Sequence, residues 1–235
     1  WKGGDSEEGA RATASHTGAL AQSDIVWRTL IRQCSAIKIE NLDEMIDTVK
    51  ALLYIKPAMG DRVGLIAMSG GQSVAITDAF AKAGLKIPLL SQSSYDRLSS
   101  FFDIIGGSYR NPFDISSSFL MSENALSNLD NMFDVMERDP NIDCIVLELF
   151  TIISPFSQDL GKPDPLLDTI SEFKNRSKKP FMTIVSAAQR ETLALEVRDR
   201  LLAKGIPSFP GFERGAKTLK RLVDYYRFRQ GQYLN

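Results

Sequence analysis

Between residues 62 and 226 the sequence alternates short apolar runs with longer segments of helical periodicity. The runs are apolar at most positions instead of every second one, which is typical of strands buried on both faces. We expect five strands, at residues 62–68, 85–90, 142–150, 180–185 and 206–209. The intervening segments predict helices, at residues 72–83, 95–102, 123–137, 165–173, 190–204 and 212–226. Strands that alternate with helices predict a parallel sheet covered by helices on both sides.

Five buried parallel strands fit an α/β fold with a flavodoxin-like, doubly wound sheet in the strand order 2-1-3-4-5. We assign residues 60–235 to this sheet domain, because the alternation is regular from there onward. Just before it, Lys56, Pro57 and Gly60 lie in a stretch that is typical of a linker, since proline and glycine interrupt regular structure.

Residues 1–55 follow a different pattern, which does not supply a sheet. They predict a loop and small-residue helix at 5–22, a helix after Ser23, a strand at 36–39 and a helix after Asn41. Asn41 is followed three residues later by a glutamate, the pattern of a capping box. A helix–strand–helix piece cannot form a core alone, so we expect a partial second α/β domain that packs on something else.

The chain begins with Trp1 and enters a glycine-rich loop at residues 2–9 at once. A loop of this kind hangs from a strand, and no strand precedes it in the sequence. We therefore expect that further residues lie upstream of Trp1 in the complete protein.

The composition is that of an ordinary folded domain and excludes several function classes. Hydrophobic residues make up 43% and charged residues 24%, so disorder is not expected. The net charge of −1 offers no electrostatic basis for binding nucleic acid or an anionic membrane, and no apolar run is long enough to span a bilayer. Cys34 and Cys144 lie in apolar patterns and predict buried, reduced thiols. With no signal-peptide pattern, we expect a cytoplasmic protein.

A glycine pair stands where the first strand of the predicted sheet meets its helix, in the motif Ser69-Gly70-Gly71-Gln72-Ser73. The amino end of a helix leaves backbone N–H groups unpaired and carries partial positive charge, so it favours phosphate. Two glycines let the anion approach the backbone without a β-carbon in the way. A plain tight turn between strand and helix has the same pattern, so both interpretations are open at this point.

His16 is the only histidine of the chain. Thr17 and Gly18 follow it, small alanines surround it, and the glycine-rich loop precedes it, so the segment has little apolar surface to anchor it. A neutral imidazole is a nucleophile towards phosphorus, although a lone histidine is often only structural or solvated. We expect no metal site, because there is no second histidine and the cysteines lack ligand spacing.

Three further polar residues are weaker candidates for a site. Glu148 lies near the end of the central apolar run, where a carboxylate faces either the crevice of the sheet or the surface. Asn111 and Asp114, in an Asn-Pro-Phe-Asp stretch, have the local chemistry of turn formers.

Three stretches of the chain resemble the motifs of a known family. Residues 9–21 read Gly-Ala-Arg-Ala-Thr-Ala-Ser-His-Thr-Gly-Ala-Leu-Ala, residues 62–71 read Arg-Val-Gly-Leu-Ile-Ala-Met-Ser-Gly-Gly, and residues 111–114 read Asn-Pro-Phe-Asp. In this order and at similar spacing they resemble the phosphohistidine segment, the next domain's strand-to-helix turn and the Asn-Pro-hydrophobic-Asp motif of NDP-forming acyl-CoA synthetases, relatives of succinyl-CoA synthetase. The similarity runs, with gaps, from Trp1 to about Tyr226.

The resemblance implies that the chain is the C-terminal part of such an enzyme. Residues 1–55 would end a phosphohistidine-bearing flavodoxin-like domain, and residues 60–235 would form a succinyl-CoA synthetase-like flavodoxin-fold domain. His16 would take a phosphoryl group from an acyl phosphate and deliver it to a nucleoside diphosphate. The motif at residues 69–73 would form one of the two helix amino ends that hold the phosphohistidine.

Gly18, Asn111 and Asp114 would then support the loops of this site. The resemblance further implies a ligase that exchanges acyl-CoA, phosphate and ADP or GDP for the free acid, CoA and ATP or GTP. CoA and ATP or ADP with Mg²⁺ would serve the full enzyme, and none would bind this chain tightly on its own. The expected partners are a CoA-binding domain and an ATP-grasp domain or subunit in a homo- or hetero-oligomer, with no nucleic acid or membrane.

The chain departs from the family pattern at two places, and a second interpretation is open. Gln22 stands where the family usually has glycine, and Cys34-Ser35-Ala36 replaces the usual Ala-Gly-Val. The alternative is a non-catalytic regulatory or effector-binding domain of an acetyltransferase-type fusion protein, in whose relatives the histidine is often lost; a fragment that serves only subunit docking is a third. The presence of His16 favours the enzyme.

Overall fold

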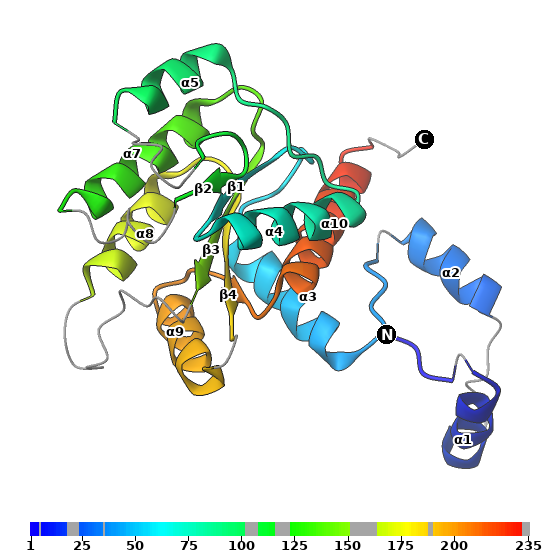
Figure 1. The fold of residues 1–235 in the computed structure, drawn as a ribbon. Coiled ribbons are helices and arrows are strands. Elements are labelled where there is room, and N and C mark those ends of the chain that lie inside the picture. The colour runs from blue at the N-terminus through cyan, green and yellow to red at the C-terminus, as the bar shows by residue number, and fades with distance from the viewer. Residues whose placement is uncertain are drawn as a thin grey trace.

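A five-stranded parallel sheet lies at the centre of the molecule, with helices on both of its faces (Figure 1). The computed structural model describes residues 1–4, 6–17, 24–34, 36–101, 108–115, 123–150, 164–187 and 190–231. The strands are β1 (Val63–Ala67), β2 (Phe113–Asp114), β3 (Cys144–Phe150), β4 (Phe181–Ser186) and β5 (Ser208–Phe209). Their order is β2-β1-β3-β4-β5, with every neighbouring pair parallel, so the flavodoxin-like, doubly wound sheet predicted from the sequence is confirmed.

Two of the strands predicted from the sequence are wrong. The run at residues 85–90 contributes only an isolated parallel bridge at Lys86, and the edge beside β1 belongs to β2 instead. Pro88 lies in that run and has no N–H group to offer a strand ladder. Residues 36–39 also form no strand, because no other strand of the described chain lies beside them to accept their hydrogen bonds.

The helices cover the two faces of the sheet unequally. On one face lie α3 (Leu42–Tyr54), α4 (Gly70–Lys82) and α10 (Phe212–Arg229). On the other face lie α5 (Gln92–Ser99), α7 (Ala125–Arg138), α8 (Pro165–Arg176) and α9 (Glu191–Ala203) (Figure 1). Among the helices that the structure describes, none has the length and the apolar character of a membrane-spanning segment.

Side chains of β3 enter two separate cores by strict alternation. Ile145, Leu147 and Leu149 pack in the core beneath α5, α7, α8 and α9, whereas Cys144 and Val146 pack in the core beneath α3, α4 and α10. Because both faces of the strand are buried, its sequence is apolar from Cys144 to Leu147 and again at Leu149, with Glu148 as the one interruption. The central strand thereby ties the two layers of helices to one sheet.

Helix α3 begins at a cap that matches the prediction and packs against the last helix. The Asn41 side chain accepts a hydrogen bond from the Glu44 N–H group at 2.9 Å. On the buried side of α3, the Asp47 carboxylate accepts a hydrogen bond from Arg214 of α10 at 2.7 Å. The last helix before the predicted boundary at residues 55–60 therefore lies against the sheet domain, and the division into two domains stays a prediction.

Helices α1 (Glu7–Thr17) and α2 (Asp24–Gln33) lie apart from the sheet (Figure 1). Three large apolar side chains of α2 are exposed: Ile25, Val26 and Leu30. Exposed apolar residues at this density are normally covered in a complete molecule. The expectation that this part of the chain packs on something else stays a prediction.

The two cysteines differ in accessibility, which corrects one prediction from the sequence. Cys144 is buried as predicted, but Cys34 is exposed because it follows α2 on the segment that lies apart from the sheet. Burial also raises the pKa of the Cys144 thiol, so little thiolate forms near neutral pH.

We therefore expect Ellman's reagent to titrate one thiol quickly in the native chain, that of Cys34, and both thiols after denaturation. The variant Cys34→Ser should leave the native chain unreactive. The release of thionitrobenzoate measures both. Fast reaction of the variant under native conditions would show that β3 is accessible to solvent.

Candidate functional site

The motif from Ser69 to Ser73 forms the start of α4, directly after β1. Ser69 is the N-cap residue, with extended backbone angles, and its hydroxyl accepts a hydrogen bond from the Gln72 N–H group at 3.4 Å. The Ser73 hydroxyl donates to the carbonyl of Gly70 at 2.8 Å. Both hydroxyl groups thus form hydrogen bonds within the first turn of the helix. The backbone N–H groups at the start of the helix are therefore the donors available to a ligand.

The N–H groups of Gly70 and Gly71 are the free donors of this helix end. Both residues are exposed, and neither N–H group has a hydrogen-bond partner among the described residues. A β-carbon at Gly71 would meet no atom within 4 Å, whereas one at Gly70 would lie 3.1 Å from Asp114 Oδ2. Free donors, the partial positive charge of the helix end and an open approach are the features that bind an oxyanion.

This helix end also lies where the winding of the sheet changes direction. From β1 the chain passes to β2 on one side, and it later crosses to β3 on the other side. Helix α4 packs on one face of the sheet and α7 on the other. In open α/β sheets, ligands bind at the carboxyl ends of the strands at such a point. The position therefore favours a binding site over a plain turn.

Asn111 holds the strand that leads into this helix end. Its side chain is 7% exposed, and its Oδ1 accepts a hydrogen bond from the Leu65 N–H group at 2.9 Å. Its Nδ2 donates to the carbonyls of Val63 at 2.8 Å and Pro88 at 2.9 Å. The side-chain amide takes the place of a strand partner along the part of β1 that β2 does not reach. Asn111 therefore stabilises β1, and its side chain has no hydrogen bond with the Gly70 and Gly71 N–H groups.

Asp114 ends β2 and lies beside the first residue of α4. Its backbone exchanges two hydrogen bonds with Ser108, at 2.7 and 2.9 Å. Its carboxylate closes the Gly70 side of the helix end, where a carboxylate is itself favoured by the helix dipole. The side of Gly71 is left as the open approach for a second anion.

Glu148 was only a weak candidate from the sequence, and the structure places it in this region. The side chain is completely buried, and its Oε2 accepts a hydrogen bond from the Met68 N–H group at 2.8 Å, one residue before the N-cap of α4. Its Oε1 has no hydrogen-bond partner among the described residues. Burial raises the pKa of Glu148 to about 7, against the opposing effect of the Met68 N–H group. The available signal was one carboxylate in an otherwise apolar strand.

His16 lies in α1, next to its last residue, but its side chain is outside the described residues, as is Gly18. The structure therefore brings together the motif at residues 69–73, Asp114 and, below them, Asn111. It does not place the imidazole relative to these groups. The pairing of His16 with the amino end of α4 stays a prediction.

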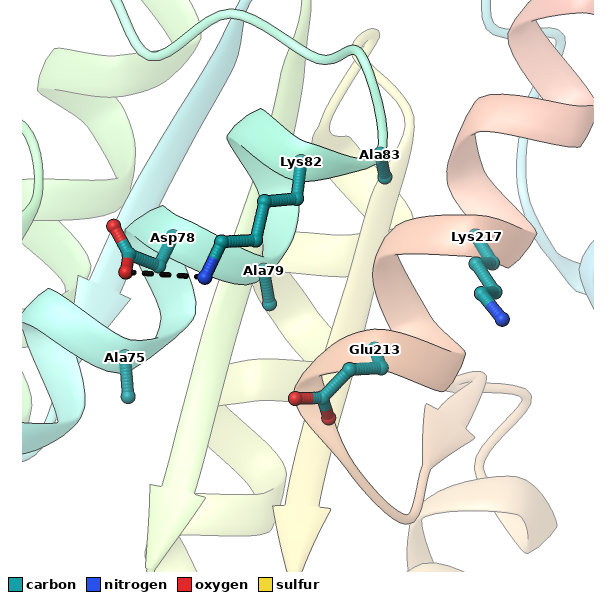
Figure 2. Close-up of a pocket in the computed structure, with 7 residues that line it drawn as sticks. All are labelled: Ala75, Asp78, Ala79, Lys82, Ala83, Glu213 and Lys217. Carbon is teal, nitrogen blue, oxygen red and sulfur yellow. Dashed lines mark hydrogen bonds and ion pairs between the residues drawn. The ribbon is translucent and has the colours of Figure 1, made fainter.

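A shallow groove runs between α4 and α10, away from the glycine pair (Figure 2). It is lined by small alanines and by mixed charges, of which Asp78 and Lys82 form an exposed ion pair at 3.4 Å. The groove thus offers no set of convergent polar groups for chemistry. Within the described ranges, no three His, Cys, Asp or Glu side chains gather closely enough to hold a metal ion.

The chain is similar to known proteins over nearly its full length. Residues 1–52 match the family model described as succinyl-CoA ligase like flavodoxin domain. The ADP-forming acetate–CoA ligase I subunit alpha of Pyrococcus furiosus is 29% identical over 232 residues, which are 97% of this chain and 46% of that protein. The ADP-forming 4-hydroxybutyrate–CoA ligase of Nitrosopumilus maritimus is 28% identical over 226 residues, which are 95% of this chain and 30% of that protein.

A solved structure shares the fold. The dinucleotide forming acetyl-coenzyme A synthetase 1 of Candidatus Korarchaeum cryptofilum, in complex with phosphate and ADP, superimposes with a TM-score of 0.73 at 22% identity, over 97% of this chain and 46% of that chain. The chain thus spans less than half the length of the relatives that it matches. The resemblance to NDP-forming acyl-CoA synthetases inferred from three motifs is confirmed.

We expect Asn111→Ala to lower the free energy of unfolding by about 3 kcal/mol, because it leaves the buried Leu65 N–H and Val63 carbonyl groups without partners. Asn141→Ala is the matched control, since it removes one exposed hydrogen bond to the Leu89 carbonyl and should cost less than about 1 kcal/mol. Urea unfolding followed by circular dichroism measures both. Equal losses would show that the Asn111 amide does not hold β1.

Proposed function

We propose that this chain is the C-terminal part of an NDP-forming acyl-CoA synthetase, a ligase that interconverts acyl-CoA, phosphate and ADP with the free acid, CoA and ATP. The observation that carries the proposal is the similarity over 97% of the chain to a protein named an ADP-forming acetate–CoA ligase subunit. Because the chain spans less than half of such relatives, a CoA-binding domain and an ATP-grasp domain or subunit would complete the enzyme. The acyl group and the choice of ADP over GDP would be set mainly in those parts.

In this proposal His16 carries the phosphoryl group between two reactions. An imidazole nitrogen attacks the phosphorus of an acyl phosphate, the bond from phosphorus to the acyl oxygen breaks, and the carboxylate of the free acid leaves. The phosphoryl group then passes from the imidazole to the terminal phosphate oxygen of a nucleoside diphosphate, which restores the neutral histidine. The nucleotide brings Mg²⁺ with it, and the described residues offer no cluster of their own for that ion.

The amino end of α4 would stabilise the phosphoryl group during the transfer. The proposal rests here on the two free N–H groups of Gly70 and Gly71, at the carboxyl edge of the sheet. Phosphoryl transfer needs fixed donors for the charge on the phosphoryl oxygens more than it needs covalent chemistry. Asn111 would hold β1, the strand that leads into this helix end, and Asp114 would flank its first residue, Gly70.

Residues 1–55 would form the end of the phosphohistidine domain, with the remainder supplied by other segments. The family match at residues 1–52 supports this division. A second support is an apolar stripe on α3, at helical spacing on the face turned away from α10: Leu42, Ile46, Val49 and Leu53. These four side chains are about half exposed or more, at 55%, 51%, 48% and 71%. An apolar stripe of this length is the face that a helix normally packs on a sheet.

The proposal places the protein in the cytoplasm, as part of an oligomer with its CoA-binding and ATP-grasp partners and without nucleic acid or membrane. Two cysteines that form no disulfide agree with a reducing compartment. The near-neutral charge agrees with partners that are other protein domains.

We expect the protein assembled with its CoA-binding and ATP-grasp modules to take up label from [γ-³²P]ATP and Mg²⁺ on His16. Phosphohistidine is labile in acid and stable in base, which separates it from a phosphoserine. The label should disappear in His16→Asn and persist in Asn141→Ala, which removes one exposed hydrogen bond outside the proposed site. Absence of label, or a label that His16→Asn retains, would overturn the enzyme and favour the effector-binding domain of an acetyltransferase-type fusion.

The apolar stripe on α3 leads to a second prediction, which concerns assembly with the other modules. Ile46→Lys with Leu53→Lys should change the free energy of unfolding of this chain by less than about 1 kcal/mol, because both side chains are exposed. The same variant should no longer elute with the remaining modules in size-exclusion chromatography. Leu89→Lys, at an apolar residue that is 66% exposed and lies outside the stripe, is the matched control. Assembly of the double variant as complete as that of the control would rule out the stripe as the interface.

A further inference from the structure

The side chain of Glu148 lies directly beneath the amino end of α4. It leaves β3 on the face that carries α4 and α10, since Cys144 and Val146, at the same alternation, pack in that core. Its carboxyl group crosses to β1 and accepts a hydrogen bond from the Met68 N–H group, the last one before the capping Ser69. The carboxyl group thus sits between the ends of the two central strands, where the winding of the sheet changes direction.

The two oxygens of the Glu148 carboxyl group differ in their hydrogen bonding. Oε2 is paired with Met68, but Oε1 is buried and has no hydrogen-bond partner among the described residues. A buried polar atom without a partner costs free energy, and such atoms are rare in folded proteins unless function requires them. Two N–H groups at the same helix end, those of Gly70 and Gly71, are also without partners in the described chain. The segment from Met68 to Gly71 thus has one buried carboxyl oxygen beneath it and two exposed N–H groups at its end, none of them paired in the described chain.

The chemistry of a ligand at this helix end follows from the charges around it. An ionised Glu148 would add a negative charge beneath a helix end that Asp114 already flanks at Gly70, and would disfavour an oxyanion there. A protonated Glu148 would instead present an O–H donor at Oε1, while Oε2 keeps its bond to Met68. Together with two backbone N–H groups, this makes a set of three donors that matches a tetrahedral oxyanion.

We propose that Glu148 keeps a proton on its free carboxyl oxygen and donates this hydrogen bond directly to a phosphoryl group bound at the amino end of α4. The inference rests on the proposed function, which brings a phosphoryl group to this helix end. Its pKa, raised by burial to about 7, keeps the carboxyl group mostly protonated below neutral pH and about half protonated at neutral pH. Binding of the anion and protonation of Glu148 are therefore linked, and each strengthens the other.

The charged groups near Glu148 come from few elements. Strands β1 and β4 carry no charged residue, and the register partner of Glu148 on β4 is Ile184. The neighbouring elements contribute Asp114 at the end of β2, Asp78 and Lys82 of α4, and Glu213, Arg214 and Lys217 at the start of α10. Asp78 pairs with Lys82, and Arg214 with Asp47. Burial, not one of these charges, is the main cause of the shift at Glu148.

The test is the affinity of the chain for sulfate and inorganic phosphate, measured by isothermal titration calorimetry as a function of pH. Phosphate titrates in the same range as Glu148, whereas sulfate keeps one charge state, so sulfate is the decisive probe. We expect the sulfate affinity of the unaltered chain to fall at least about tenfold between pH 6 and pH 8.5, as the donor proton is lost. Glu148→Gln keeps an acceptor for Met68 and a permanent N–H donor, so its affinity should hardly change with pH. Glu148→Leu should bind sulfate weakly throughout, and Asp114→Asn should keep the pH dependence.

A second readout shows that the variants remain folded. Glu148 has a folded-state pKa above its ordinary value, so the folded chain holds a proton that the unfolded chain releases, and stability falls as pH rises towards about 7. Glu148→Gln should therefore unfold at higher urea concentration than the unaltered chain at pH 8, with a smaller difference at pH 5.

The outcomes separate the two proposals. Sulfate binding that does not depend on pH, or that Glu148→Gln leaves as pH-dependent as before, overturns the role of Glu148 while the anion site stands. Absence of sulfate and phosphate binding at every pH overturns both the role of Glu148 and the phosphoryl site of the proposed function. Labelling of His16 in the assembled protein tests the transfer reaction independently of either result.

Discussion

The parallel pairing of β1 with β3 is the interaction on which the candidate site depends. Its register, from Val63 opposite Cys144 to Ile66 opposite Leu147, makes both strands end at the same edge of the sheet. One strand continues into α4, and the other carries Glu148, which lies 80 residues further along the chain. Each strand is buried on both faces, so a change of register would move apolar side chains of two cores at once. The stability of the sheet therefore guarantees the geometry of the helix end.

The electrostatics of this edge balance two opposite tendencies. The start of α4 attracts negative charge through its dipole and its unpaired N–H groups, but Asp114 already occupies one side of it. A second carboxylate there would cancel the attraction for an oxyanion. Burial of Glu148 works against that second charge, because a neutral carboxyl group is the cheaper form in an apolar surrounding. The apolar core below the site thus decides how much anion the helix end attracts.

Helix α3 joins two parts of the molecule by having two different faces. Towards α10 it offers Asp47 and Glu44, which pair with Arg214 and Arg221 at 2.7 and 2.6 Å. Its opposite face is an apolar stripe that the described residues leave exposed. In the proposed enzyme, a phosphoryl group has to pass between modules, and a helix that packs on both of them holds their relative position. The ion pairs with α10 and the apolar packing on the proposed partner module involve different side chains of α3, so each contact forms without disturbing the other.

Elements whose signals are local could be predicted from the amino-acid sequence. Apolar runs over β1, β3 and β4, the cap at Asn41 and the glycine turn into α4 all depend on neighbours within a few residues, and the structure agrees with them. Which segment pairs with β1 could not be predicted in this way, because a two-residue strand such as β2 is held by distant contacts and not by its own propensity. The use of the Asn111 amide as a strand partner and the burial of Glu148 have the same origin. Both depend on groups 46 to 80 residues away, which no local pattern in the sequence brings together.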